Sequence, residues 1–156
     1  MAVDMFLKLD GVKGESADSK HKGEIEILSF SWGVSQAIAE HGGASSGKVS
    51  SNDFSIMKEF DTASPQLMEM ICSGQSAGSA LLTLRKAGEK PLEYLKIKLT
   101  DVLISSYQTG GGNGGVPVES VSFSFSNIEV SAFEQKADGS LGQEVSSSCH
   151  FGGGKR

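Results

Sequence analysis

The segment Gly43-Ala44-Ser45-Ser46-Gly47 has the G-x-S-x-G spacing of a hydrolase nucleophile. In such enzymes the serine lies on a sharp turn between a strand and a helix, where its hydroxyl is exposed. Here a strand pattern follows the segment, and the spacing of His21, His41 and His150 places no base beside the serine. We therefore favour a glycine- and serine-rich loop over a small hydrolase, and we predict that each histidine lies in a solvent-exposed loop.

Two further patterns could bind a metal ion or a phosphate. Zinc sites use paired ligands a few residues apart, and Cys72, Cys149 and His150 do not supply such pairs. Cys72 is predicted to be a buried helix residue and Cys149 a free thiol in the tail. The glycine-rich residues 109–115 lack the Gly-Lys-Ser/Thr ending of a P-loop and precede a strand pattern, so a hairpin loop is predicted there. No metal and no cofactor are expected.

Serines alternate with apolar residues on two strand patterns: Ser29, Ser31 and Ser35, then Ser120, Ser122, Ser124 and Ser126. Exposed sheet faces commonly carry Lys, Glu and Thr, as Lys96 and Lys98 do here. One interpretation is an ordinary solvated face with a bias toward serine. The other is a small, neutral, wet surface that offers hydroxyl donors and acceptors without fixed charge.

The elements that must position these residues have mostly a period of two, which predicts a mainly β protein. Strand patterns cover residues 5–9, 24–35, 49–60, 80–86, 92–103, 121–126 and 128–132. The apolar phase slips at Ile27-Leu28 and again near Asn127, which predicts a β-bulge or a strong bend. One short helix is predicted at about residues 64–73, with Ser64 as N-cap and Gly74 at its C-terminal end. Asp138-Gly139 predicts a hairpin turn.

Length and composition predict a single domain over residues 1–156, with residues 146–156 forming a tail of little regular pattern. The formal net charge of −5 argues against nucleic acid, because nucleic-acid binding relies on Lys and Arg at the phosphates. Two cysteines cannot form a disulfide framework. No apolar stretch is long enough to span a membrane, and the N-terminus lacks the basic region and apolar core of a secretory signal.

At Glu24-Ile-Glu-Ile-Leu-Ser-Phe-Ser-Trp-Gly-Val-Ser-Gln36 the chain resembles the Hcp (haemolysin-coregulated protein) family of bacterial type VI secretion systems. Leu84-Arg-Lys-Ala87 and Gln135-Lys-Ala-Asp-Gly139 are similar to that family as well. The resemblance spans about residues 2–142. The family usually finishes with an aromatic strand containing Gly-Trp, of which only Phe151-Gly152 is left here, so the last strand is expected to be short.

The resemblance implies a small β-barrel of two antiparallel sheets with one short α-helix. It implies a structural subunit and no enzyme: six copies form a ring, rings stack into a tube, and a contractile sheath expels the tube behind a VgrG-type spike. Secreted effectors travel in the lumen. The protein is then made in the cytoplasm and reaches the extracellular space or a target cell without a signal peptide, and without membrane insertion.

Two groups of residues follow as candidate sites under this resemblance. The lumen and effector contacts are expected at Ser29, Ser31, Ser35, Ser120, Ser122 and Ser124. The loop that contacts the next ring is expected at Glu40, His41, Gly42, Gly43, Ala44, Ser45, Ser46 and Gly47. The alternative function is a secreted β-sandwich binding module, which would show aromatic residues on an exposed face.

Overall fold

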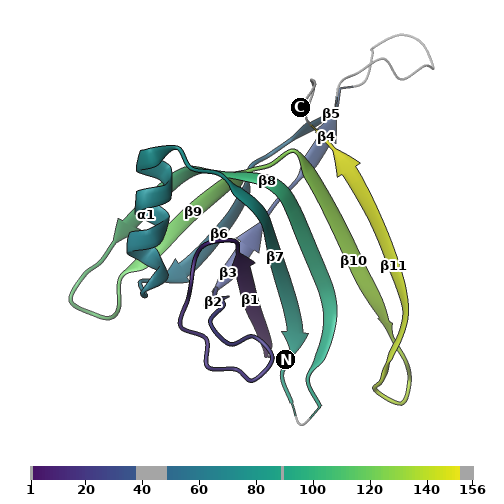
Figure 1. Cartoon of the computed structure of the whole chain (residues 1–156). Helices are drawn as coiled ribbons and strands as arrows, with labels where there is room; N and C mark the ends of the chain where they lie inside the picture. The colour runs from purple at the N-terminus through teal and green to yellow at the C-terminus, as the bar shows by residue number, and fades with distance from the viewer. Residues whose placement is uncertain (1, 38–48, 89, 152–156) are drawn as a thin grey trace.

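The computed structural model describes residues 2–37, 49–88 and 90–151, and it is built from antiparallel strands with one helix (Figure 1). Strand β1 begins at one end of the molecule, and strand β11 ends at the other, close to β4 and β5 (Figure 1). In chain order the elements are β1 (Val3–Leu9), β2 (Ile25–Glu26), β3 (Ser29–Ser31), β4 (Val34–Gln36), β5 (Val49–Ser51), β6 (Phe54–Glu59), α1 (Ala63–Ser73), β7 (Ala77–Lys86), β8 (Leu92–Gly110), β9 (Val118–Ser124), β10 (Asn127–Gln135) and β11 (Leu141–His150).

Nine of these strands form one rolled surface in the order β2-β1-β7-β8-β9-β6-β3, with β10 also paired to β8 and β11 paired to β10. The long strand β8 joins the two sheets of this surface. Its first part pairs with β7 and β10, and its residues 103–110 pair with β9. Between the two parts, Asp101 has a φ of 56°, a conformation rare for residues other than glycine. A single strand thus turns the chain from one sheet into the other.

The two ends of the roll meet where β2 and β3 follow one another in the chain. Ile27 N–H donates to Met5 O at 3.2 Å, and Leu28 N–H donates to Met57 O at 2.7 Å. Ile27 therefore bonds to β1 and the next residue, Leu28, bonds to β6. At this seam two backbone hydrogen bonds replace a continuous pairing of strands. The predicted fold class, mainly β with two antiparallel sheets and one short helix, is confirmed, and the described strands form a rolled surface in place of a fully closed barrel.

The two phase slips in the sequence mark the places where the chain changes sheets. We expected a bulge or bend within one strand at Ile27-Leu28, but the chain there leaves the sheet of β1 for that of β6. Near Asn127 it passes from β9 to β10, which belong to different sheets. The bulges of the pairing lie elsewhere, at 84/85, 104/106 and 133/135. A slip exchanges the buried and exposed sides, and a change of sheet requires the same exchange.

The core fills the inside of the roll with apolar side chains from both sheets. The most deeply buried include Leu7, Leu9, Ile25, Phe54, Ile56, Leu67, Leu82, Leu99, Val121 and Phe123. Trp32 is half-buried at the edge of the core, where its ring lies 6.4 Å from each of the Phe125 and Phe151 rings. Trp32 Nε1 donates to Ser51 Oγ at 2.8 Å, which ties β5 to this aromatic cluster.

Helix α1 differs from the prediction in two respects, the residue that caps its N-terminus and the residues that face solvent. The N-cap is Thr62, not Ser64, because the Ser64 hydroxyl is buried among side chains of the sheet. Cys72, predicted to be buried, is exposed, while Leu67 is buried. The C-terminal end is as predicted: Gly74 has a φ of 72° and its N–H donates to Ile71 O. A side chain at Gly74 would be strained in this left-handed conformation.

Strand β11 occupies part of the segment that showed little pattern in the sequence. Its residues through His150 pair with β10 across the turn at Gly139, whose φ is 87°. The predicted hairpin at Asp138-Gly139 is therefore confirmed, and residues 146–150 are a strand where we expected a tail. Cys149 lies in this strand as a free, exposed thiol. Within the described ranges no helix is both long and apolar enough to cross a membrane.

Candidate functional site

The outer side of one sheet carries a continuous band of serines, which we call the serine face. It is the side of β3, β6, β9 and residues 103–110 of β8 that points away from the core. Its members with hydroxyl side chains are Ser29, Ser31, Ser55, Ser106, Ser120, Ser122 and Ser124. Four of them stand in one row across four neighbouring strands, in the order Ser31, Ser55, Ser122 and Ser106.

Strand alternation explains how this face forms. Phe54 and Ile56 on β6, and Val121 and Phe123 on β9, are at most 1% exposed and point into the core. Every residue between them must point outward, because successive side chains of a strand lie on opposite sides of the sheet. Within the serine row the Ser55 and Ser122 hydroxyls are 2.9 Å apart, so they satisfy one another. The face is thus the outer side of the best-packed part of the core.

The structure brings five of the six predicted serines together on the serine face and separates one, Ser35. Ser29 and Ser31 lie on β3, Ser120 and Ser122 on β9, with β6 between the two strands. Ser124, at the end of β9, lies opposite Leu103. Ser35 lies in the separate two-stranded ribbon of β4 and β5, where its hydroxyl is 3.2 Å from that of Ser50. The predicted contact loop, Glu40 to Gly47, lies outside the described residues, and so does His41.

Sequence reasoning missed two members of the row, Ser55 and Ser106. For Ser55 the signal was present, since Phe54 and Ile56 on either side are apolar and predict that Ser55 points outward. For Ser106 the signal is obscured by the bulge between Ile104 and Ser106, which changes the side on which the following residues point. The bulged Ser105 instead donates from its hydroxyl to Asp53 Oδ2 at 2.6 Å.

A buried charged network lies directly behind the serine face. Lys58 on β6 and Glu119 on β9 are cross-strand partners that point into the core, and both are fully buried. Lys58 Nζ donates to Glu119 Oε1 at 2.8 Å and to Ser64 Oγ at 2.9 Å. Ser64 Oγ donates to the same carboxylate oxygen at 2.6 Å, and the Tyr107 hydroxyl donates to Glu119 Oε2. The network joins β6, β8, β9 and the start of α1.

This network perturbs the titration of its members in opposite directions. Burial and then the hydrogen bond to Glu119 raise the pKa of Tyr107 to about 12. Burial would raise the pKa of Glu119 too, but hydrogen bonds from Lys58, Ser64 and Tyr107 outweigh it and lower the pKa. A serine beside a lysine can be a nucleophile and base, yet Ser64 is only 1% exposed. In the folded chain this hydroxyl is shielded from solvent and bonded to Lys58 and Glu119, so it links α1 to the sheet.

Against the other sheet, His21 lies in the connection between β1 and β2 as predicted, but it is buried and not exposed. Its ring stacks on Phe6 with centroids 4.4 Å apart, and it is only 7% exposed. His21 Nδ1 lies 3.0 Å from Glu24 Oε1, and Nε2 lies 2.7 Å from Glu93 Oε2. Sequence gave no sign of this, because Glu93 is distant in the chain. His150 is exposed as predicted, but it lies in a strand and not in a loop.

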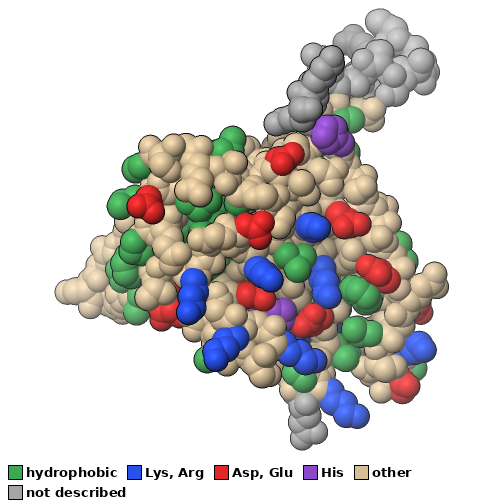
Figure 2. Space-filling view, viewed as in Figure 1, with side chains coloured by type: hydrophobic (Ala, Val, Ile, Leu, Met, Phe, Trp, Pro, Cys, Tyr) green, Lys and Arg blue, Asp and Glu red, His purple; other side chains and the backbone are tan. Residues whose placement is uncertain are grey.

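Next to His21, Arg85 pairs with two aspartates. Its guanidinium donates to Asp18 at 2.8 and 2.9 Å and to Asp4 at 3.2 Å, and it lies over the Phe6 ring at 4.9 Å. The hydrogen bonds from Arg85 hold the pKa of Asp18 well below its usual range. Cations and anions are interspersed over this side of the molecule, around β1, β7 and the first part of β8 (Figure 2). This side of the molecule is thus rich in charged side chains, whereas the serine face is mostly uncharged.

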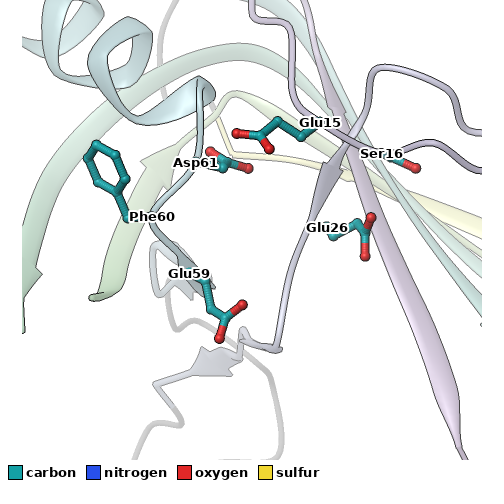
Figure 3. Close-up of a pocket in the computed structure, with 6 residues that line it drawn as sticks. All are labelled: Glu15, Ser16, Glu26, Glu59, Phe60 and Asp61. Carbon is teal, nitrogen blue, oxygen red and sulfur yellow. The ribbon is translucent and has the colours of Figure 1, made fainter. Parts of the chain in front are cut away.

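A hollow lined by carboxylates lies where β6 ends and β2 begins (Figure 3). Glu15 and Asp61 point toward one another there, and Phe60 points away from the acidic side chains. Glu15 Oε2 accepts from Thr62 N–H at 2.7 Å, and Asp61 Oδ1 lies 2.9 Å from Lys58 Nζ. The remaining acidic members are Glu26 and Glu59. Among the residues that the structure describes, no group of three or more His, Cys, Asp or Glu is arranged to hold a metal ion.

Comparison with known proteins places these features in a family. A family model described as "Type VI secretion system effector, Hcp" matches residues 6–131. The curated protein hcp1 of Pseudomonas aeruginosa is 46% identical over 143 residues, which cover 89% of this chain and 88% of that protein.

Two solved structures are similar over almost the whole chain. Hcp1 from Salmonella typhimurium has a TM-score of 0.83 and 37% identity, over 97% of this chain and 96% of that one. A type VI secretion system effector from Yersinia pestis has a TM-score of 0.79 and 36% identity, over 94% and 99% respectively. With a family match over most of its length and these two folds, the chain belongs to the Hcp family of type VI secretion system proteins.

Proposed function

We propose that this protein is a structural subunit of the inner tube of a type VI secretion system. Six copies form a ring, rings stack into a tube, and the serine face lines the lumen, where it carries or protects secreted effectors. The single observation that carries this proposal is the chemistry of the serine face. Within β3, β6, β9 and residues 103–110 of β8, Glu59 is the one charged side chain that points outward, and none of the outward side chains is a cation.

A lumen that different cargoes enter and leave needs these properties. Short hydroxyl side chains leave room and exchange hydrogen bonds with water or with a passing protein at little cost. A dense single-sign charge would hold oppositely charged cargo tightly and repel the rest. In this proposal the effector contacts are Ser29, Ser31, Ser120, Ser122 and Ser124, joined by Ser55 and Ser106. Ser35, which lies on the β4–β5 ribbon, is proposed to face the same lumen from that ribbon.

The ribbon of β4 and β5 supports a role in stacking for the loop that it carries. Val34 and Val49 lie diagonally across one side of this ribbon and are each 49% exposed. Apolar side chains on a two-stranded ribbon indicate a surface that another molecule covers. We propose that the loop Glu40 to Gly47 and the exposed side of the ribbon contact the next ring.

The mixed charged surface around Arg85 and His21 suits the outside of a tube. There it would face solvent and the contractile sheath, while the end of the tube would meet a VgrG-type spike. The protein then has no enzymatic role and needs no cofactor. It is made in the cytoplasm and leaves by contraction to the extracellular space or a target cell, without inserting into a membrane. The formal charge of −5 speaks against nucleic acid as a partner.

The test is the native mass of the full chain together with negative-stain imaging. The proposal expects a species of six times the 16.3 kDa chain mass, seen as rings with a central hole. Arginine at Ser122 should remain compatible with rings, whereas arginine in a subunit interface should not. A monomer at all concentrations, without rings, would overturn the tube function and favour a secreted β-sandwich binding module instead.

A further inference from the structure

Besides Leu103, which lies apart from them opposite Ser124, the serine face contains two large apolar side chains that are neighbours of one another. Met57 on β6 and Val118 on β9 are each 38% exposed. Met57 lies opposite Ser120 and Ser29, and Val118 lies opposite Glu59. On one side of a sheet, residues offset by two positions on neighbouring strands are diagonal neighbours within reach of one another. Met57 and Val118 thus form one apolar spot within a polar surface.

Charge is also concentrated at this spot. Glu59 follows Met57 by two residues on the same side of β6, and no described residue bonds to its carboxylate. Glu26 on β2 and Glu59 both line the hollow of Figure 3. Lys58, the cation nearest in sequence, points into the core and is fully buried. The apolar spot therefore borders the carboxylates of Glu59 and Glu26, which form no ion pair with a described cation, whereas Asp61 of the same hollow pairs with Lys58.

We propose that Met57, Val118 and Glu59 form the site that selects the protein segments carried against the serine face; this inference rests on the function proposed above. The occupant is an extended segment with an aliphatic side chain and a Lys or Arg two residues away. Met57 and Glu59 are two residues apart on one strand, about 7 Å, which is the spacing of alternate side chains in an extended chain. Methionine adapts its flexible side chain to aliphatic groups of different shapes, which suits a site that receives several partners.

The serine row and the apolar spot have different roles in binding under this proposal. The serine row offers hydrogen bonds that any polypeptide backbone can use, so it does not discriminate among sequences. The apolar spot gives contact area to one side chain, and Glu59 with Glu26 attracts the basic residue beside it. A segment of the same length with an acidic residue in that place meets repulsion.

The experiment uses the full chain labelled with ¹³C at its methionine methyl groups, and three synthetic peptides. The first is acetyl-Ser-Leu-Ser-Lys-Ser-amide, the second replaces Leu with Ser, and the third replaces Lys with Glu. Binding of the first peptide should shift the Met57 methyl resonance and leave that of Met68 in place. Met68 is the matched control, since it is 51% exposed but lies on α1, outside the serine face.

Variants separate the two parts of the site. Met57→Ser should weaken binding of the first peptide by about tenfold, and Met68→Ser should leave it unchanged. Glu59→Gln should remove the preference for the Lys peptide over the Glu peptide, while Glu69→Gln on α1 should retain it. Equal binding of all three peptides, or a shift of Met68 in place of Met57, would overturn the site.

Native mass of the same samples keeps the two proposals apart. Rings that form but do not distinguish the peptides would contradict this site and leave the tube function standing. Failure of the unaltered chain to form rings would contradict the tube function. If Met57→Ser itself prevents ring formation in an otherwise competent chain, Met57 lies in a subunit interface and the assignment to cargo is wrong.

Discussion

At the scale of single residues, Ser122 is the sharpest test of where the serine face points. It stands in the middle of the serine row, between Ser55 and Ser106, and is half-buried by them. Ser122→Arg loses one hydroxyl contact and adds a long charged side chain that can extend away from the sheet. We expect a loss of at most about 1 kcal/mol in the free energy of unfolding, because surface substitutions are usually mild.

The same variant should form rings but retain effectors less well, measured by co-purification of a defined effector with the ring. Ser19→Arg, in an exposed loop on the opposite sheet, is the control and should keep normal retention. If rings fail to assemble with Ser122→Arg, this serine lies in an interface between subunits and not in the lumen.

Tyr107 predicts an alkaline transition. Its pKa in the folded chain is raised to about 12 from an ordinary value of 10, so the folded state holds the phenolic proton more tightly than the unfolded state does. The stability that this group contributes is therefore complete below about pH 10 and is lost as the pH rises through about 12. The chain has two tyrosines, so the Tyr94→Phe variant leaves the absorbance of the Tyr107 phenolate as a single signal. A midpoint near pH 10 in that variant would show that Tyr107 is neither buried nor bonded to Glu119 in solution as it is in the structure.

At the scale of elements, the Lys58–Glu119 pair attaches helix α1 to the sheet through Ser64. The helix has eleven residues, which is too short to be stable alone, so it depends on such contacts. Lys58→Met leaves Glu119 buried without its cation and should lower the free energy of unfolding by about 3–5 kcal/mol. Urea unfolding followed by the fluorescence of Trp32, the single tryptophan, measures this.

A double variant gives the control for that prediction. Lys58→Met with Glu119→Leu removes both charges and should recover most of the loss, because well-packed apolar residues often replace a buried ion pair at little cost. Recovery is not expected for Lys58→Met with Glu129→Leu, since Glu129 is an exposed residue of β10. A double variant as unstable as Lys58→Met alone would show that the pair is not the cause.

The loop carried by the β4–β5 ribbon belongs to the same scale. Deletion of residues 44–47 shortens the segment 40–47, which contains no large apolar residue. Stability should hardly change, because loop-closure entropy varies slowly with length. Rings should still form but stack less, as seen by sedimentation and imaging, and secretion should fall. Normal tubes would exclude the loop from stacking, and monomers would place it in the contact between subunits.

At the scale of the whole molecule, the formal charge limits how copies can associate. Each chain carries −5, so a ring of six accumulates six times that charge and is opposed by mutual repulsion. Salt screens repulsion between exposed charges, and the apolar and backbone contacts of an interface do not depend on it. Raising the ionic strength should therefore leave rings intact or favour stacking, measured by sedimentation velocity. Rings that fall to monomers in moderate salt would show that ion pairs hold them.

The sequence by itself determined the fold class and most of the elements. Local patterns of the sequence predicted several features, because these depend on neighbours a few residues apart. They are the period of two, the strands before and after the helix, Gly74 at the helix end and the turn at Asp138-Gly139. The outward direction of Ser31 and Ser122 was legible for the same reason. The phase slip at Ile27-Leu28 was visible too, although its cause was not.

Only the tertiary structure decided which residues meet across the chain. His21 is buried where it contacts Glu93, which is seventy-two residues later in the chain. Ser64 is not the N-cap, because its hydroxyl bonds to the buried Lys58 and Glu119. Ser35 lies apart from the other serines, whereas Ser55, Met57 and Ser106 lie on the same side of the sheet as they do. Strand order and one bulge determine which residues share that side. Local patterns specify on which side of a strand a residue points. Which strands are neighbours depends on burial summed over the whole core, which no single segment of sequence contains.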